Sequence, residues 1–191
     1  FSLLYSTQDP EVNYVRCMNI FRDKLIISFG HKCFNPYLLS VDQNNKAKVI
    51  KTGIPSPRSD IYVMKVFQNE LYMAAAAYHN NEALDGCEIW KWDGSEFCKV
   101  IEHGFGNSNN IYILSMQTYK NNLFAATYNY IDGCEIWNTN DGINWTKTAD
   151  RGLGSSDNES VIYGLMEYNG KLYCGTRNFR EGFELYTIEE S

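Results

Sequence analysis

The chain carries a leucine-anchored segment several times, and in most copies a polar residue stands six places after the leucine. The candidate set comprises His31, Asn129 and Asn178, the adjacent Tyr128 and Arg177, and Tyr78, His79, Asn80 and Asn81 from an insertion. These side chains donate and accept hydrogen bonds, and aromatic rings add stacking surface, so the set could bind a polar ligand such as a sugar or a protein loop. The same residue types are common in surface turns. Ligand binding and turn formation are therefore both open for this set.

Arg177 would supply the only fixed positive charge of the candidate set. If the ligand were anionic, its binding would weaken at high salt, because salt screens exposed charges.

Other kinds of reactive site lack their usual sequence patterns. The three histidines (His31, His79 and His103) do not have the HExxH spacing of zinc enzymes, and the six cysteines form no CxxC pair. The glycines of 104–106 and 152–154 do not extend to the GxGxxG phosphate motif, and GxSxG is absent. We therefore predict no catalytic residue, no metal site and no cofactor. Most cysteines lie in apolar strand patterns, which favours free buried thiols over disulfides.

A glutamate also recurs at one position of the repeat, as Glu88, Glu135 and Glu184. A ring of carboxylates could bind a cation. However, each glutamate alternates with large apolar residues along a strand. A repeated structural hydrogen bond or ion pair is the favoured interpretation.

The elements that would position these residues follow from the repeat itself. Three related segments are CEIWKWDGSEF (87–97), CEIWNTNDGINW (134–145) and FELYTIEES (183–191). Upstream of each stand an aromatic residue, a polar two-residue turn and a leucine. The anchoring leucines are Leu25, Leu71, Leu123 and Leu172, which lie 46, 52 and 49 residues apart. The chain thus contains four units of about 48 residues.

Each unit is predicted to form a four-stranded antiparallel sheet. An apolar run such as 111–119 leads into a polar turn typical of a hairpin, and the second, third and fourth strands follow. No window sustains the apolar stripe of a helix. Short strands that recur in fours with a period of about 40–50 residues are typical of β-propeller blades. The predicted fold is therefore an all-β propeller with four blades.

Ring closure is predicted from the two ends of the chain. The last unit stops after its third strand, and Ser2–Thr7 could supply the missing fourth strand, so that 3+1 strands close the ring without an open edge. The single domain would then be 1–191, with units of about 8–52, 53–104, 105–154 and 155–191 plus 1–7. In the alternative, residues 3–9 align with the third strand of a unit, and the chain is a fragment of a larger propeller.

The segment from Thr139 to Trp145 resembles the Asp-box hairpin of sialidase-like propellers, and Asp93–Phe97 is a partial second copy. The repeat as a whole is similar to lectin-like propellers and to propeller repeats of large microbial surface proteins. The resemblance implies an extracellular or cell-surface location and a structural role for Asp141. Trp145 is expected to pack on strands of its own blade. Sialidase activity would need an arginine triad, and the six arginines do not recur at one position.

Composition narrows the function further. The net charge of −6 and the pI of about 5.1 argue against a nucleic-acid binder. The apolar run 71–78 is far shorter than the roughly 20 residues of a membrane-spanning helix. We expect a non-enzymatic recognition or scaffolding module; the alternatives are a carbohydrate-active hydrolase or lyase and an architectural subunit. The sequence does not predict the ligand or the oligomeric state.

Overall fold

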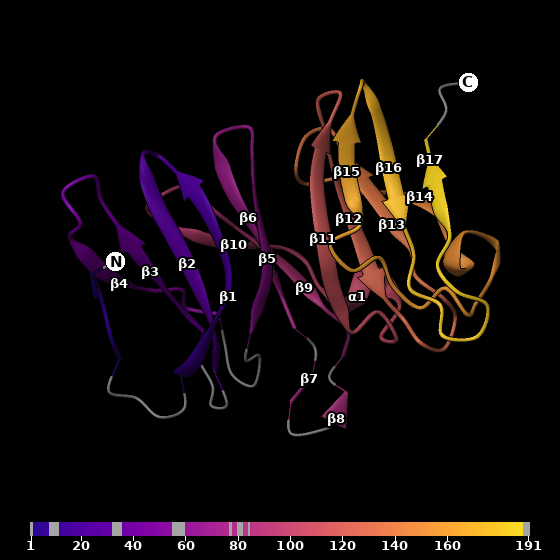
Figure 1. Cartoon of the computed structure of the whole chain (residues 1–191), viewed down its shortest axis with the longest axis horizontal. Coiled ribbons are helices and arrows are strands. Elements are labelled where there is room, and N and C mark those ends of the chain that lie inside the picture. The colour runs from indigo at the N-terminus through magenta and orange to yellow at the C-terminus, as the bar shows by residue number, and fades with distance from the viewer. Residues whose placement is uncertain are drawn as a thin grey trace.

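The chain folds into four antiparallel sheets that lie side by side along its long axis (Figure 1). The structure is a computed structural model that describes residues 2–7, 12–31, 36–54, 60–76, 78–79, 82–83 and 85–188. The prediction of an all-β chain built from four repeated sheets is confirmed.

The strands of the sheets follow one another in chain order. The first sheet contains β1 (Val12–Phe21), β2 (Lys24–His31), β3 (Tyr37–Val41) and β4 (Ala47–Lys51). The second contains β5 (Ile61–Phe67), β6 (Glu70–Ala75), β9 (Glu88–Trp92) and β10 (Phe97–Ile101), and the short pair β7 (Tyr78–His79) and β8 (Glu82–Ala83) is inserted between β6 and β9. The third contains β11 (Tyr112–Tyr119), β12 (Asn122–Tyr128), β13 (Ile136–Thr139) and β14 (Thr146–Ala149). The fourth contains β15 (Leu165–Tyr168), β16 (Lys171–Gly175) and β17 (Leu185–Thr187).

A two-residue turn joins the first two strands of every sheet, as the polar dipeptides predicted. Both turn residues have positive φ in each case, for example 47° and 61° at Gln68 and Asn69 and 49° and 69° at Asn169 and Gly170. This is the type I′ geometry whose twist matches that of paired strands. The turns therefore fix the register of each sheet.

Each sheet has two faces that we name by their neighbours. The front face packs on the following sheet, and the back face packs on the preceding sheet. The first strands β1, β5, β11 and β15 contact one another in that order. Because the second and third sheets are covered on both faces, their second strands are apolar at nearly every position, as in the buried run 71–76.

The core consists of three clusters, one between each pair of neighbouring sheets. Phe21 and Ile26 of the first sheet pack on Met64 and Leu71 of the second. The next cluster includes Phe67, Tyr72, Met116 and Leu123, and the third includes Tyr119, Phe124, Leu165 and Leu172. Each sheet thus buries its apolar residues against its sequence neighbours.

The predicted closure through Ser2–Thr7 is wrong. Within the described residues, 2–7 form no strand, and the fourth sheet consists of β15, β16 and β17 only. Leu4 instead lines a surface hollow with Ile20, Leu25 and Val41 of the first sheet. The link between residues 7 and 12 spans at most about 17 Å. It therefore holds 2–7 near the first sheet, whereas the fourth sheet lies at the other end of the molecule (Figure 1).

The aspartate turns are structural, as expected. Oδ1 of Asp141 accepts hydrogen bonds from the backbone N–H groups of Ile143 (2.9 Å) and Asn144 (2.7 Å). Asp93 and Asp42 organise their turns in the same way. The ring of Trp145 is half-buried, lies edge-on to Phe105 and packs against the cluster that contains Met116 and Leu123 of its own sheet as well as Phe67 of the second sheet. The loop that carries Phe105 reaches this ring from outside the third sheet.

The described cysteines are free thiols, which agrees with the prediction; Cys33 lies outside the described residues. Cys87, Cys134 and Cys174 are buried, and Cys98 is exposed. Burial raises the pKa of Cys134 and of Cys174 to about 12. These two thiols are therefore poor nucleophiles.

Candidate functional site

A continuous row of aromatic and guanidinium side chains crosses the molecule from the first sheet to the fourth. We call it the Tyr–Arg row; it comprises Tyr14, Arg16, Tyr62, Tyr112, Tyr128, Arg177 and Phe179, with Tyr130 beside Tyr128. It lies at the edge where first strands begin and second strands end. The β7–β8 pair extends from the same edge, at the bottom of Figure 1.

At the start of the row, Arg16 joins the first two sheets. Its guanidinium carbon lies 4.6 Å from the ring centroid of Tyr14 and 4.1 Å from that of Tyr62. Nη2 of Arg16 also forms an ion pair with Asp60 at 2.5 Å. Cation–π contacts and the ion pair together fix the guanidinium between two aromatic rings.

The row continues through the third sheet to the fourth. The ring centroids of Tyr62 and Tyr112 are 4.8 Å apart, and those of Tyr112 and Tyr128 are 5.8 Å apart with an interplanar angle of 12°. The guanidinium of Arg177 lies 5.1 Å from the Tyr128 centroid and 4.4 Å from that of Phe179. The contacts of Tyr62 with Tyr112 and of Tyr128 with Arg177 therefore cross sheet boundaries, whereas Tyr112 and Tyr128 stack within the third sheet.

Irregularities in the register of two first strands orient the side chains of two members of this row. The register of β1 shifts between Val15 and Cys17, and that of β5 shifts between Ile61 and Val63. Arg16 and Tyr62 are thus the extra residues of β-bulges. A bulge re-aims a side chain at a sheet edge, and here it turns both side chains toward each other.

The charges of the row are compensated. Burial lowers the pKa of Arg16, but the hydrogen bond to Asp60 and neighbouring charges outweigh it, so that the pKa of Arg16 is raised overall. Burial also raises the pKa of Tyr62. Arg177 pairs with Glu159 at 3.0 Å. The row thus presents neutral phenols between two ion pairs and carries little net charge.

Two residues of the predicted set lie in this row, and two others lie beneath the surface. Tyr128 and Arg177 contact each other as described, whereas the side chains of Asn129 and Asn178 are buried. Oδ1 of Asn129 accepts hydrogen bonds from the backbone N–H groups of Ile131 (3.0 Å) and Asp132 (2.8 Å). Asn178 does the same for the two residues at the equivalent loop positions. We assign both asparagines to turn formation.

These buried amides belong to a network that appears twice. Nδ2 of Asn129 donates to Oδ1 of Asn110 (3.1 Å), and Asn110 in turn donates to the carbonyl of Gly104 (2.8 Å) and to Oε2 of Glu135 (2.7 Å). In the next copy, Asn178, Asn158, Gly152 and Glu184 make the same contacts. Each network ties the loop that enters a sheet to two strands of that sheet.

The loops that this network holds have an unusual, left-handed backbone conformation. In α1 (His103–Gly106) and η1 (Arg151–Gly154) every residue has positive φ, from 53° to 85° in the first and from 48° to 113° in the second. Such left-handed turns favour glycine, which explains the Gly-x-Gly segments. The glycines of these segments therefore have a structural role, and the absence of phosphate binding stays a prediction.

His31, Tyr78 and His79 of the predicted set lie at the same edge. His31 ends β2, where it pairs with Val12, and Tyr78 and His79 form β7. Nothing is assigned to their side chains. Asn80 and Asn81 lie outside the described residues.

The recurring glutamates are structural, as favoured. Glu88 accepts a hydrogen bond from Nε1 of Trp90 (2.8 Å), and Glu135 accepts one from Nε1 of Trp137 (2.9 Å). Lys147 pairs with Glu135 at 2.8 Å. Among the described residues, no group of three His, Cys, Asp or Glu is placed to hold a metal ion.

Sequence reasoning missed Arg16, Tyr62 and Tyr112 as members of the site. The available signal was the Ile-Tyr pair that opens two of the first strands, at 61–62 and 111–112.

Within the described ranges, no helix has the length and apolar character needed to cross a membrane.

Comparisons with known proteins add a structural neighbour. No family model and no curated protein matches the chain. Among solved structures, the chain is similar to the crystal structure of an ancestral GH74 enzyme, with a TM-score of 0.61 and 11% sequence identity. The match covers 97% of this chain and 28% of the enzyme, so the chain spans less than a third of the enzyme's length. At this identity the likeness concerns the fold alone.

Proposed function

We propose that the chain is a β-propeller-type recognition module without catalytic activity, whose Tyr–Arg row binds a neutral polar ligand, with a glycan as the leading class. The row itself carries the proposal. Partly exposed phenol rings at successive sheets present ring edges and hydroxyl groups beside two guanidinium groups, which suits the alternating C–H and O–H surfaces of a sugar chain.

The propeller is supported by the four repeated sheets and by the fold of the GH74 neighbour, a propeller-type glycoside hydrolase. Tyr128 and Arg177 stay in the proposed site. His31, Tyr78 and His79, the other predicted residues at this edge, are proposed as its rim, and Asn80 and Asn81 stay a prediction.

The ion pairs of the row favour binding over hydrolysis. Glycoside hydrolysis ordinarily needs two carboxyl groups that face the scissile bond. Asp60 and Glu159, the carboxylates paired with the row, are each engaged by an arginine. Because Arg177 is paired, we expect a neutral ligand and little salt dependence rather than an anionic ligand.

A glycan array that spans neutral and acidic oligosaccharides tests the proposal, followed by calorimetric titration of each hit. Tyr128→Ala and Tyr112→Ala should each weaken binding at least tenfold, because each removes one ring and one hydroxyl group of the row and leaves its neighbours unsupported. Tyr5→Ala, which removes a tyrosine ring outside the Tyr–Arg row, should not change affinity. Raising the salt concentration tenfold should change affinity less than threefold.

Two results would contradict the proposal. Binding that survives a combined Tyr112→Ala, Tyr128→Ala and Arg177→Ala replacement would place the site elsewhere. Release of shorter sugars during long incubation with a bound oligosaccharide would favour the hydrolase alternative instead.

A further inference from the structure

An ion pair between the third and fourth sheets lies at the surface of the Tyr–Arg row. Nη2 of Arg177 lies 3.0 Å from Oε2 of Glu159, and the two side chains are 33% and 24% exposed. The other ion pair of the row, between Arg16 and Asp60, is less open, because 20% and 8% of its side chains are exposed. Both groups of the Arg177–Glu159 pair are therefore within reach of a ligand.

Backbone hydrogen bonds fix the position of this ion pair. The N–H group of Asn129 donates to the carbonyl of Glu159 (2.8 Å), and the N–H group of Arg177 donates to the carbonyl of Ser160 (2.7 Å). Ser160 also pairs with Tyr128, so the segment that carries Glu159 lies between the ends of β12 and β16. The pair is therefore held in place before a ligand arrives, which lowers the entropic cost of binding.

Both members of the ion pair keep hydrogen-bonding capacity. Within the described residues, the guanidinium of Arg177 makes one side-chain hydrogen bond, from Nη2 to Glu159. A guanidinium carries five N–H donors and a carboxylate has about four lone-pair sites, so one contact exhausts neither group. The rings of Tyr128 and Phe179 contact the same guanidinium and restrict its movement. The pair thus presents a charged donor and a charged acceptor side by side.

Tyr130 adds an apolar surface beside this pair. Its ring centroid lies 6.1 Å from that of Tyr128, the ring that contacts Arg177. Tyr128 is itself stacked on Tyr112, whereas Tyr130 is 51% exposed although the fourth sheet follows its own. The loop of Tyr130 is anchored by the buried Asn129, so the ring stands on a fixed backbone.

We propose that Tyr130, Arg177 and Glu159 bind one pyranose ring that carries free hydroxyl groups on two adjacent carbons. The apolar face of the sugar packs on Tyr130. One hydroxyl accepts a hydrogen bond from the guanidinium, and its neighbour donates one to the carboxylate. Such hydroxyls are joined through a single C–C bond, which suits a donor and an acceptor that lie 3.0 Å apart. The inference rests on the proposed function and adds the hydroxyl pattern that the glycan must carry.

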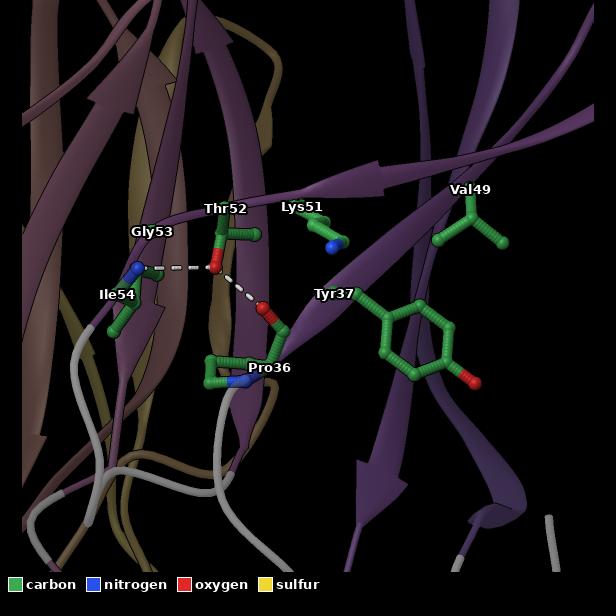
Figure 2. A pocket seen from close by; sticks show the side chains of 7 residues that line it. All are labelled: Pro36, Tyr37, Val49, Lys51, Thr52, Gly53 and Ile54. Carbon is green, nitrogen blue, oxygen red and sulfur yellow. Dashed lines mark hydrogen bonds between the residues drawn. The ribbon is translucent and has the colours of Figure 1, made fainter.

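A hollow on the first sheet is the rival place for a sugar ring. It has a volume of about 390 Å³ and is lined by Tyr37, Val49 and Lys51 together with residues 36 and 52–54. Figure 2 shows the Tyr37 ring and the Val49 side chain projecting beside it. None of these lining residues carries a carboxylate, so the hollow lacks the charged acceptor. Tyr37→Ala is therefore the matched control for Tyr130→Ala.

Calorimetric titration tests the proposal with trisaccharides of glucose, galactose and mannose, each as the parent and with single hydroxyls removed one at a time. Loss of either recognised hydroxyl should weaken binding about tenfold. Glu159→Gln should weaken binding of the parent about tenfold, because a neutral amide replaces a charged acceptor. It should change binding of the analogue that lacks the donating hydroxyl less than twofold. Arg177→Lys should likewise spare the analogue that lacks the accepting hydroxyl.

Two further variants separate the ring from the ion pair. Tyr130→Ala should weaken binding of the parent and of all analogues by the same factor, because it removes the surface under the sugar. Arg180→Ala, which breaks the neighbouring exposed ion pair with Asp157, should not change affinity. Thermal melts of every variant distinguish loss of binding from loss of folding.

The outcomes distinguish this inference from the proposed function. If folded Glu159→Gln weakens the parent and every analogue equally, the diol contact is overturned. The proposed function then stands where Tyr112→Ala still weakens binding. Loss of affinity in Tyr37→Ala but not in Tyr130→Ala would place the sugar in the hollow of the first sheet and overturn both. A wild-type chain that binds none of the trisaccharides would also overturn both.

Discussion

Gly142 lies in the turn of Asp141, where its φ is 76°. A Cβ atom at this position would stand 1.9 Å from the hydroxyl of Tyr72, a buried residue of the second sheet. That hydroxyl also donates to Glu70 and cannot move away freely. Two constraints, one local and one from the neighbouring sheet, therefore require glycine.

We expect Gly142→Ala to lower the free energy of unfolding by about 2–4 kcal/mol, the sum of left-handed backbone strain and overpacking. Gly170→Ala is the matched control, because its φ is 69° and no atom lies within 4 Å of the added Cβ. It should cost only the backbone part, about 1 kcal/mol. Urea titration measures both; equal losses would contradict the contact with Tyr72.

The aspartate turns also predict acid sensitivity. Hydrogen bonds from the Asn144 side chain and from backbone N–H groups hold the pKa of Asp141 well below its usual range, and backbone and Ser95 hydrogen bonds lower that of Asp93 to about 2. A carboxyl with a lower pKa in the folded chain stabilises the fold above its unfolded pKa of about 4. That stabilisation is lost as the pH falls from about 4 toward the folded pKa. The melting temperature should therefore drop below pH 4.

Asp141→Asn should flatten this acid dependence, because it removes one of the titrating groups and lowers stability at neutral pH. Asn140→Gln, at an exposed uncharged position of the same turn, should leave the slope unchanged. Thermal melts between pH 2 and pH 7 decide the matter, and identical slopes for all three proteins would argue against the turn as the cause.

At the scale of elements, the connections between sheets depend on Asn110 and Asn158. Asn110→Asp would replace the amide that faces Glu135 with a second buried carboxylate. We expect a loss of about 3–5 kcal/mol, as for other broken buried networks. Asn45→Asp, in an exposed turn with φ of 60°, should change stability by less than about 0.5 kcal/mol. Similar losses for both variants in chemical unfolding would count against the network.

The elements also show which signals the sequence carries. The hairpins were predictable because a polar dipeptide between apolar runs is a local signal. This signal located the first hairpin of all four sheets. The burial of Asn129 was not predictable, because its partner Asn110 comes from a loop nineteen residues earlier that folds back only in three dimensions. The Tyr–Arg row depends on bulges and on contacts between sheets, which no strand pattern reports. Tyr128 and Arg177 therefore stay a prediction until a ligand is measured.

At the scale of the whole molecule, the main contacts between the described parts of the sheets join sequence neighbours. The predicted closure of the ring by Ser2–Thr7 was wrong, because the strand count of the last unit shows that a fourth strand is missing but does not show which segment would supply it. A linear array is held at its middle by two interfaces per sheet and at each end by one. The end sheets should therefore open first.

Hydrogen exchange measures this gradient. Amides of β11 and β12 should exchange at least tenfold more slowly than those of β15 and β16. Uniform protection across the four sheets would mean that the chain unfolds as one unit.

The paired networks around Asn110 and Asn158 suggest that the molecule is built from interchangeable parts. The two asparagines are 48 residues apart, and so are the glycines 104 and 152 that receive their hydrogen bonds. Removing residues 105–152 would join Gly104 directly to Leu153 and present the entrance of the fourth sheet with the same contacts that the third one had. We therefore expect the chain to tolerate the loss or gain of one whole repeat unit. A three-sheet version should fold, with new side-chain packing only at the interface between the two sheets that the deletion brings together. Length in such a molecule behaves as a count of modules rather than as a continuous quantity.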